Sequence, residues 1–168
     1  MFKGLKWLIR LFLVLAIIFV VGYVYYVYID HGVAMTSYQE EIVDSLGSPE
    51  QFSISYLPKG SDEGSEFVRQ ETWYYPSRKQ KVNFLNGRLV DVAELEVADD
   101  ASYNHSQYSP SDFDVYTTLS QIKNLVGEKN IAALELPGFY GEGIETWASS
   151  GAVFIFENDY LTYVETLD

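Results

Sequence analysis

Acidic and histidine side chains are the residues whose spacing could support catalysis or metal binding. Adjacent acids occur at Glu40-Glu41 and Asp99-Asp100, and two carboxyl groups can serve as acid and base on a glycan. Acids at the start of a predicted helix are more simply explained by the helix dipole, and those in a polar segment by solvation. The two histidines, His31 and His105, have no second His or Cys at metal-ligand spacing. We therefore expect no metal site and no cofactor.

Glu71 and Glu145 stand out because each precedes Thr-Trp, in Glu71-Thr72-Trp73 and Glu145-Thr146-Trp147. Catalysis rarely needs the same acid twice, so the repetition favours a contact made at the end of a strand in both places. No serine lies in a nucleophile elbow with a His/Asp constellation. The sequence therefore predicts a protein without catalytic residues, and a glycan hydrolase that uses these acids is the least favoured hypothesis.

The elements around the first of these acids follow a simple order. Ser37-Tyr38-Gln39-Glu40 has the spacing of a capping box, and Gly47-Ser48-Pro49 ends the predicted helix. The stretches FSISYL, FVRQETWYY, KVNFL and RLVDVAEL are typical of strands, and Asn86-Gly87 predicts a hairpin turn between the last two. The first unit is therefore one helix followed by about four antiparallel strands.

The same order occurs again beyond residues 96–112, which are polar, acidic and serine-rich and are predicted to be a linker. Thr118 to Gln121 has capping-box spacing, a helix ends at Gly127, and strand-like stretches follow. Thirteen residues match in order between the two copies, which indicates a tandem repeat. The matched residues of the first copy are Ile42, Gly47, Leu57, Pro58, Glu63, Gly64, Glu71, Thr72, Trp73, Phe84, Asn86, Leu89 and Val92.

The repeat predicts an α+β fold with an N-terminal transmembrane helix and two tandem helix-plus-antiparallel-sheet repeats. Its expected parts are a cytoplasmic stub and anchor (1–30), a first repeat (31–95), the linker (96–112) and a second repeat (113–168). Each repeat alone is small for a stable core. The two sheets could join or abut, with both helices on one face and the other face open to solvent or a partner.

Aromatic residues supply the candidate core and the candidate binding residues. The shared large side chains are predicted to fill the core, with a binding role for the tryptophans as the alternative; they are Trp73, Trp147, Phe84 and Phe156. Tyr74 has the opposite strand parity and is predicted to lie on the open face. Phe139 and Tyr140 lie between two glycines in a loop where the first repeat has Gly60-Ser61. We expect this pair to contact a partner or to fold back over the second core.

Residues 11–29 have the composition of a membrane anchor. This uncharged run of 19 residues follows three basic residues, and about 20 apolar residues cross the hydrocarbon layer as a helix. The basic residues predict a cytoplasmic N-terminus and an exported remainder. A cleaved signal peptide is the alternative, since Gly32-Val33-Ala34 has small residues where a peptidase could cut. The apolar region of a signal peptide is usually about 7 to 15 residues long, which is shorter than this run. The representative anchor residues are Leu11, Phe12, Val20, Tyr23, Tyr25, Tyr26 and Tyr28.

Charge and cysteine content limit the partners and the cross-links. The chain has no cysteine, so it has no disulfide and no lipidated N-terminal cysteine. All 24 acidic residues but only eight of the 11 basic ones follow the anchor, which leaves the exported part with a net charge of −16. This charge repels nucleic acid and anionic lipid headgroups, and a basic protein partner is compatible with it.

The capped helix that ends in LGSP, followed by ETWYYP and VNFLNGRLVDV, resembles the BamE-like (SmpA/OmlA) family of small envelope proteins. The resemblance covers about residues 35–95 and, more weakly, 117–166. The tandem arrangement is also similar to that of the β-lactamase inhibitor protein. Members of the family are typically outer-membrane lipoproteins, whereas this chain has no cysteine to carry a lipid. The resemblance implies a non-enzymatic binding module.

Together these features predict a periplasmic protein-binding module that is tethered to the bacterial inner membrane. We expect it to act as an envelope assembly or scaffolding adaptor and to bind a periplasmic or envelope protein. The alternative is an inhibitor or immunity protein that binds a basic enzyme or toxin.

Overall fold

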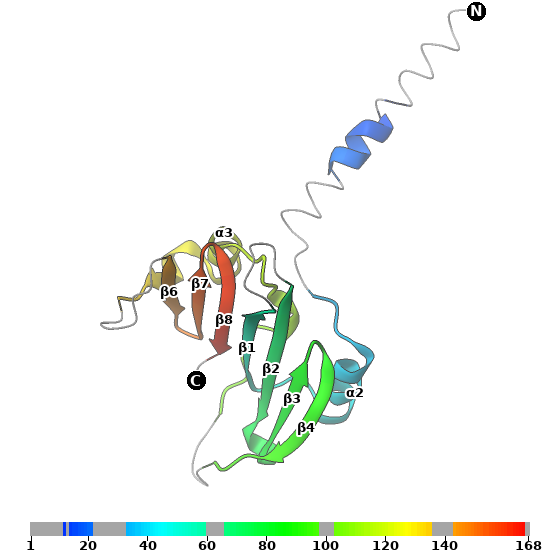
Figure 1. Ribbon diagram of the computed structural model, residues 1–168, viewed down its shortest axis with the longest axis vertical. Coiled ribbons are helices and arrows are strands. Elements are labelled where there is room, and N and C mark those ends of the chain that lie inside the picture. The colour runs from blue at the N-terminus through cyan, green and yellow to red at the C-terminus, as the bar shows by residue number, and fades with distance from the viewer. Residues whose placement is uncertain are drawn as a thin grey trace, which may run out of the picture. The chain divides into compact units, whose positions relative to one another are not determined.

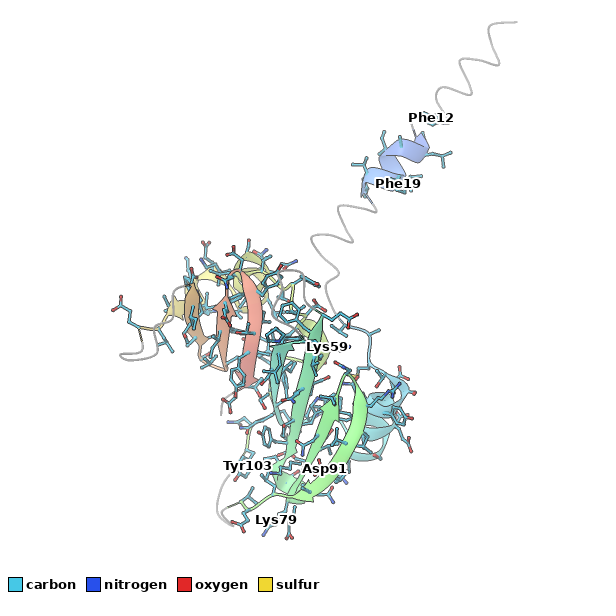
Figure 2. The ribbon with its side chains drawn as sticks, in the orientation of Figure 1. Phe12, Phe19, Lys59, Lys79, Asp91 and Tyr103 are labelled. Carbon is cyan, nitrogen blue, oxygen red and sulfur yellow. The ribbon has the colours of Figure 1, made fainter. Side chains whose placement is uncertain are left out.

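The computed structural model describes residues 12, 14–21, 33–59, 66–97, 103–135 and 143–166. The chain forms two compact units, Met1–Gly32 and Val33–Asp168. In the first unit, residues 12 and 14–21 are helical, and Figure 2 shows Phe12 and Phe19 projecting from this helix. Phe12 and Val20 are 75% and 58% exposed. Among the described residues, no helix has the length and apolar character needed to cross a membrane. The other predicted anchor residues lie outside the described residues; they are Leu11, Tyr23, Tyr25, Tyr26 and Tyr28.

The second unit is an α+β fold built on one antiparallel sheet of eight strands, in the order β4-β3-β2-β1-β8-β7-β6-β5. The helices are α2 (Ser37–Leu46) and α3 (Leu119–Val126). The strands of the first half are β1 (Gln51–Pro58), β2 (Phe67–Tyr75), β3 (Gln80–Leu85) and β4 (Arg88–Glu94). Those of the second half are β5 (Ile131–Ala133), β6 (Ile144–Ser149), β7 (Ala152–Glu157) and β8 (Tyr160–Thr166).

The two halves join into one sheet through β1 and β8, which lie side by side in Figure 1. These strands are antiparallel, and Ile54 lies opposite Val164. The repeat pattern left open whether two sheets would join or abut. Pairing of residues 53–55 with 163–165 answers this question, because it makes the two halves one continuous sheet.

Both helices begin with a threonine cap and end at a glycine. Thr118 and Gln121 form the predicted capping box of α3. The box of α2 is formed by Thr36 and Gln39 instead of Ser37 and Glu40, so that prediction was wrong by one residue. The physical reason is that the Thr36 hydroxyl is fixed from outside the helix, because it also donates to the carbonyl oxygen of Gly87.

The two halves share the same departures from regular strand geometry. A β-bulge follows Asn83 on the β3–β4 pair, and another follows Ile155 on the β7–β8 pair. The turns after these bulges are Asn86-Gly87, with φ 48° and 70°, and Asn158-Asp159, with φ 50° and 68°. Left-handed backbone at both turn positions is typical of the tight hairpins that Asn-Gly favours.

The core lies on one face of the sheet. Directly paired residues point to the same face of a sheet, and Phe52, Trp73 and Val82 form one such row across β1, β2 and β3. Ile42 of α2 and Ile122 of α3 pack against the same cluster, so both helices cover this face. Its largest fully buried side chains are Trp73, Tyr75, Phe52, Phe84, Phe113, Phe154, Ile54, Ile122, Leu161, Val82 and Val164.

The described part of the predicted linker contributes to this core. Tyr108 is 7% exposed, and Pro110 is among the fully buried side chains. Phe113, which follows directly, has its ring centroid 6.0 Å from that of Phe52 on β1 and 5.8 Å from that of Phe154 on β7. The segment from 103 to 117 therefore packs across both halves of the sheet, although its polar composition is typical of a solvated connection.

Candidate protein-binding site

Glu71 lies at the centre of a buried hydrogen-bond network in the first half. Its Oε1 accepts a 2.8 Å hydrogen bond from Nε of Arg69 and another of 2.8 Å from Nε2 of Gln39 on α2. Its Oε2 accepts from the indole nitrogen of Trp73 at 3.1 Å. The residue is 2% exposed. Glu71 was predicted to contact a partner, but the structure places it in the core with all its neighbours inside the chain.

Arg69 extends this network to the segment from 103 to 117. Its guanidinium donates to the carbonyl oxygens of Pro110 and Phe113, the first at 2.6 Å, and to the Tyr56 hydroxyl at 2.7 Å. That hydroxyl itself donates to the Phe113 carbonyl at 2.8 Å. Burial raises the pKa of Tyr56 far above its ordinary value, and the nearby Arg69 opposes this shift only in part. Arg69 thus ties β1, β2 and the 103–117 segment together.

The second half repeats the acid and the tryptophan but not the arginine. The indole nitrogen of Trp147 donates to Oε2 of Glu145 at 3.1 Å, the same distance as in the first half. Gly143 stands two residues before Glu145, where the first half has Arg69. Glu145 is exposed, and Trp147 is only partly buried. The ammonium of Lys123 lies 4.6 Å from the centroid of the Trp147 ring.

The face of the sheet opposite the helices is the other candidate surface. Tyr74 lies on it, opposite Gln51 and Lys81, and is partly exposed. We call this surface the open face; its partly exposed members near the centre of the sheet are Ser53, Ser55, Thr72, Tyr74, Asn83, Val153, Ile155, Tyr163 and Glu165.

Tyr163 is the second large aromatic side chain of the open face. Its hydroxyl donates to Oε2 of Glu165 at 2.9 Å. Partial burial raises the pKa of Tyr163 above its ordinary value, and the hydrogen bond to Glu165 raises it further. The hydroxyl therefore stays protonated and keeps its donor at neutral pH.

The remaining predicted residues are distributed between the core and the undescribed loop. Trp73, Phe84 and Phe156 lie in the core, with 0%, 2% and 4% of their surface exposed. Phe139 and Tyr140 lie outside the described residues. Gln39, Tyr56 and Arg69 were not predicted from the sequence. For Arg69 the available signal was its place two residues before a glutamate in a strand, which puts both side chains on one face.

Among the described residues, the surface of this unit has hollows that include the following two. One, of about 340 Å³, is lined by Tyr56, Arg69 and Tyr116 among others, and one of about 450 Å³ is lined by Met35, His105 and Tyr108 among others. Within the described ranges, no three His, Cys, Asp or Glu side chains gather as a possible metal site. In the first hollow the polar atoms of Arg69 already bind the chain itself, so its arrangement is that of a structural network.

Comparison of the chain with protein-family models, with curated proteins and with solved structures gave no match. The functional conclusion therefore rests on the residues and the geometry of this chain.

Proposed function

We propose that this chain is a non-enzymatic protein-binding module, tethered to the bacterial inner membrane, whose sheet unit lies in the periplasm and acts as an envelope assembly or scaffolding adaptor. The observation that carries the proposal is the one-sided sheet. Both helices and the segment from 103 to 117 pack on one face, while the side chains of the open face are partly exposed. A half-covered antiparallel sheet of this kind can bury its second face against a partner.

The size and the chemistry of the open face support a protein partner. The eight strands are separated by seven spacings of roughly 4.8 Å, and each strand has about six residues of roughly 3.3 Å. The open face is therefore roughly 34 Å wide and roughly 20 Å long, an area of roughly 600 to 700 Å². A partner in a stable complex contributes about 800 Å². Tyrosines dominate many interfaces energetically, and Tyr74 and Tyr163 lie on this face among small polar side chains.

The tether and the compartment are supported by the sequence. The uncharged run 11–29 follows three basic residues, which favours a single-pass anchor with a cytoplasmic N-terminus. The resemblance of the helix, Trp and hairpin motifs to BamE-like envelope proteins agrees with a periplasmic binding role.

The charge of the exported part favours a second candidate, an inhibitor or immunity protein. Its net charge of −16 would attract a basic enzyme or toxin and would make the association rate fall with salt. An adaptor should instead copurify with envelope assembly proteins and resist moderate salt.

Affinity capture with matched variants tests the binding function. The full-length chain is captured from native membranes after mild crosslinking, as wild type, as Ser53→Arg and as Ser45→Arg. Ser53 lies on the open face, opposite Thr72 and Glu165, whereas Ser45 is exposed on α2. We expect Ser53→Arg to lose the captured protein and Ser45→Arg to retain it. Equal capture by both variants would exclude the open face as the binding surface.

A further inference from the structure

The two Glu-Trp pairs of this fold occupy the same place in their hairpins. Glu71 lies opposite Phe84, and Glu145 lies opposite Phe156. In each hairpin the backbone amide of the turn asparagine donates to the carbonyl oxygen two residues before the acid. The two bonds are Asn86 N to Arg69 O at 2.7 Å and Asn158 N to Gly143 O at 3.0 Å. Gly143 is therefore the structural counterpart of Arg69.

The first copy shows how a guanidinium fits this pair. The indole nitrogen of Trp73 donates a hydrogen bond to Oε2 of Glu71, and Nε of Arg69 donates one to Oε1. A second guanidinium nitrogen of Arg69 lies 3.3 Å from Oε2. The planar guanidinium of Arg69 thus donates to both carboxylate oxygens of Glu71. A lysine ammonium cannot reproduce this geometry.

The second copy has the same acceptor without the donor. Among the described residues, Glu145 accepts only from the Trp147 indole, through Oε2, and the ion pairs found there are Lys59–Glu66 and Arg69–Glu71. Lys123 lies over the face of the Trp147 ring, whereas the bond to Glu145 comes from the edge of the ring. Within the part of the chain that the structure describes, Oε1 of Glu145 therefore has no donor in the place where Oε1 of Glu71 is bound.

The chain cannot supply an arginine at position 143 itself. Gly143 has a φ of +82°, and a Cβ added there would lie 2.5 Å from Oδ1 of Asn158. A side chain at this position would have to displace the side chain of Asn158 and would meet the strain of left-handed backbone. A guanidinium that fills this place must therefore come from another part of the chain or from another molecule.

We propose that Glu145 and Trp147 bind an arginine side chain of the protein partner, in the place that Arg69 fills in the first copy. Because Glu145 lies opposite the core residue Phe156, this contact belongs to the helix-covered side of the sheet and is a second contact, apart from the open face. This inference rests on the proposed binding function and names the chemistry of the partner's contact residue. Charge complementarity supports it, because the exported part has a net charge of −16 and Glu145 is exposed. A buried guanidinium–carboxylate pair made this way would add orientation as well as affinity.

The test uses the two tryptophans as internal reporters. The indole N–H resonances of the full-length chain are followed by NMR during titration with N-acetyl-arginine amide and, at equal ionic strength, with N-acetyl-lysine amide. We expect the Trp147 resonance to shift saturably with the arginine amide and not with the lysine amide, and the buried Trp73 resonance to stay in place. Glu145→Gln should abolish the shift, and Glu157→Gln, which removes an exposed acid of the adjacent strand β7, should retain it.

The possible outcomes separate this inference from the binding function. A Trp147 resonance that does not move, or that moves equally in Glu145→Gln, overturns the arginine site. If affinity capture still recovers a protein on the open face, the binding function stands without it. A selective Trp147 shift in a chain that captures no protein supports the guanidinium site and contradicts the binding function.

Discussion

Nε of Arg69 donates a 2.8 Å hydrogen bond to Oε1 of Glu71, and their side chains are only 12% and 1% exposed. The pair lies where α2, β2 and the segment from 103 to 117 meet, through Gln39 and the carbonyl oxygen of Pro110. A buried ion pair adds little net stability compared with an apolar pair, but losing one partner leaves a charge in the core. The pair therefore fixes how these elements pack, and the matching acid Glu145 has no such role.

Glu71→Gln should lower the free energy of unfolding by about 3 kcal/mol, because it leaves the Arg69 charge without its carboxylate. The matched change Glu145→Gln should alter it by less than about 0.5 kcal/mol, since that acid is exposed. Urea unfolding of both variants checks this. Equal losses would mean that the burial of Glu71 does not determine its contribution.

Gly87→Ala should destabilise the fold by about 2 to 3 kcal/mol. Gly87 has a φ of +70°, and an added Cβ would clash with Cγ2 of Thr36, the residue that caps α2. Left-handed backbone costs alanine about 1 kcal/mol, and loss of a helix cap costs about 1 kcal/mol more.

Asp159→Ala is the control for this change, because Asp159 has the equivalent turn position with a φ of 68°. It should cost less than about 1 kcal/mol, because aspartate already bears most of the strain of left-handed backbone. If the two alanines had the same effect on thermal unfolding, the contact between Thr36 and Gly87 would not contribute to stability.

Alkaline pH should destabilise the fold, in part through Tyr56. Burial raises the folded-state pKa of Tyr56 above its unfolded value, which is about 10. The stability that this tyrosine contributes is therefore complete below pH about 10 and is lost as pH rises toward the folded pKa, by about 1.4 kcal/mol per pH unit.

Tyr56→Phe tests this pH dependence. The variant should be less stable at neutral pH, because the hydroxyl bonds the Phe113 carbonyl and Arg69, and its curve should converge with the wild-type curve above pH about 10. Urea unfolding at a series of pH values measures the difference. Parallel curves at alkaline pH would show that Tyr56 ionises equally in both states.

Phe139→Ser combined with Tyr140→Ser should weaken partner capture and leave the melting temperature nearly unchanged. The expectation follows from the sequence, where two aromatic residues stand between glycines and would leave apolar surface uncovered in a free chain. Thermal unfolding and affinity capture are measured on the same sample. A fall of several degrees in Tm would place the pair in the core instead.

The local elements of this fold were predictable because their signals are local. Asn86-Gly87 predicts a hairpin turn because few other residues adopt the left-handed backbone that the turn needs. In β1 the alternation of apolar and polar residues predicts which face of the strand is buried. The repeated Glu-Thr-Trp placed β2 and β6 in corresponding positions. These features need neighbours only a few residues apart.

The features that could not be predicted depend on residues far apart in the sequence. The pairing of β1 with β8 joins Ile54 to Val164, and no local pattern specifies it. Tyr108 and Phe113 anchor a segment whose average composition is polar. Glu71 and Glu145 are both followed by Thr-Trp, yet one is buried and the other exposed. The difference comes from Arg69, which donates to the carbonyl oxygens of Pro110 and Phe113. These partners are far from Arg69 in the sequence and come near it only in the folded chain.

Site-specific photocrosslinking in native membranes tests the binding function most directly. A photoreactive side chain replaces Tyr74 on the open face in one variant of the full-length chain and Ser45 on α2 in the other. The proposed function predicts one discrete protein adduct from position 74 and none from position 45. No adduct from position 74, or the same mixture of adducts from both positions, would contradict the claim that the open face binds a protein.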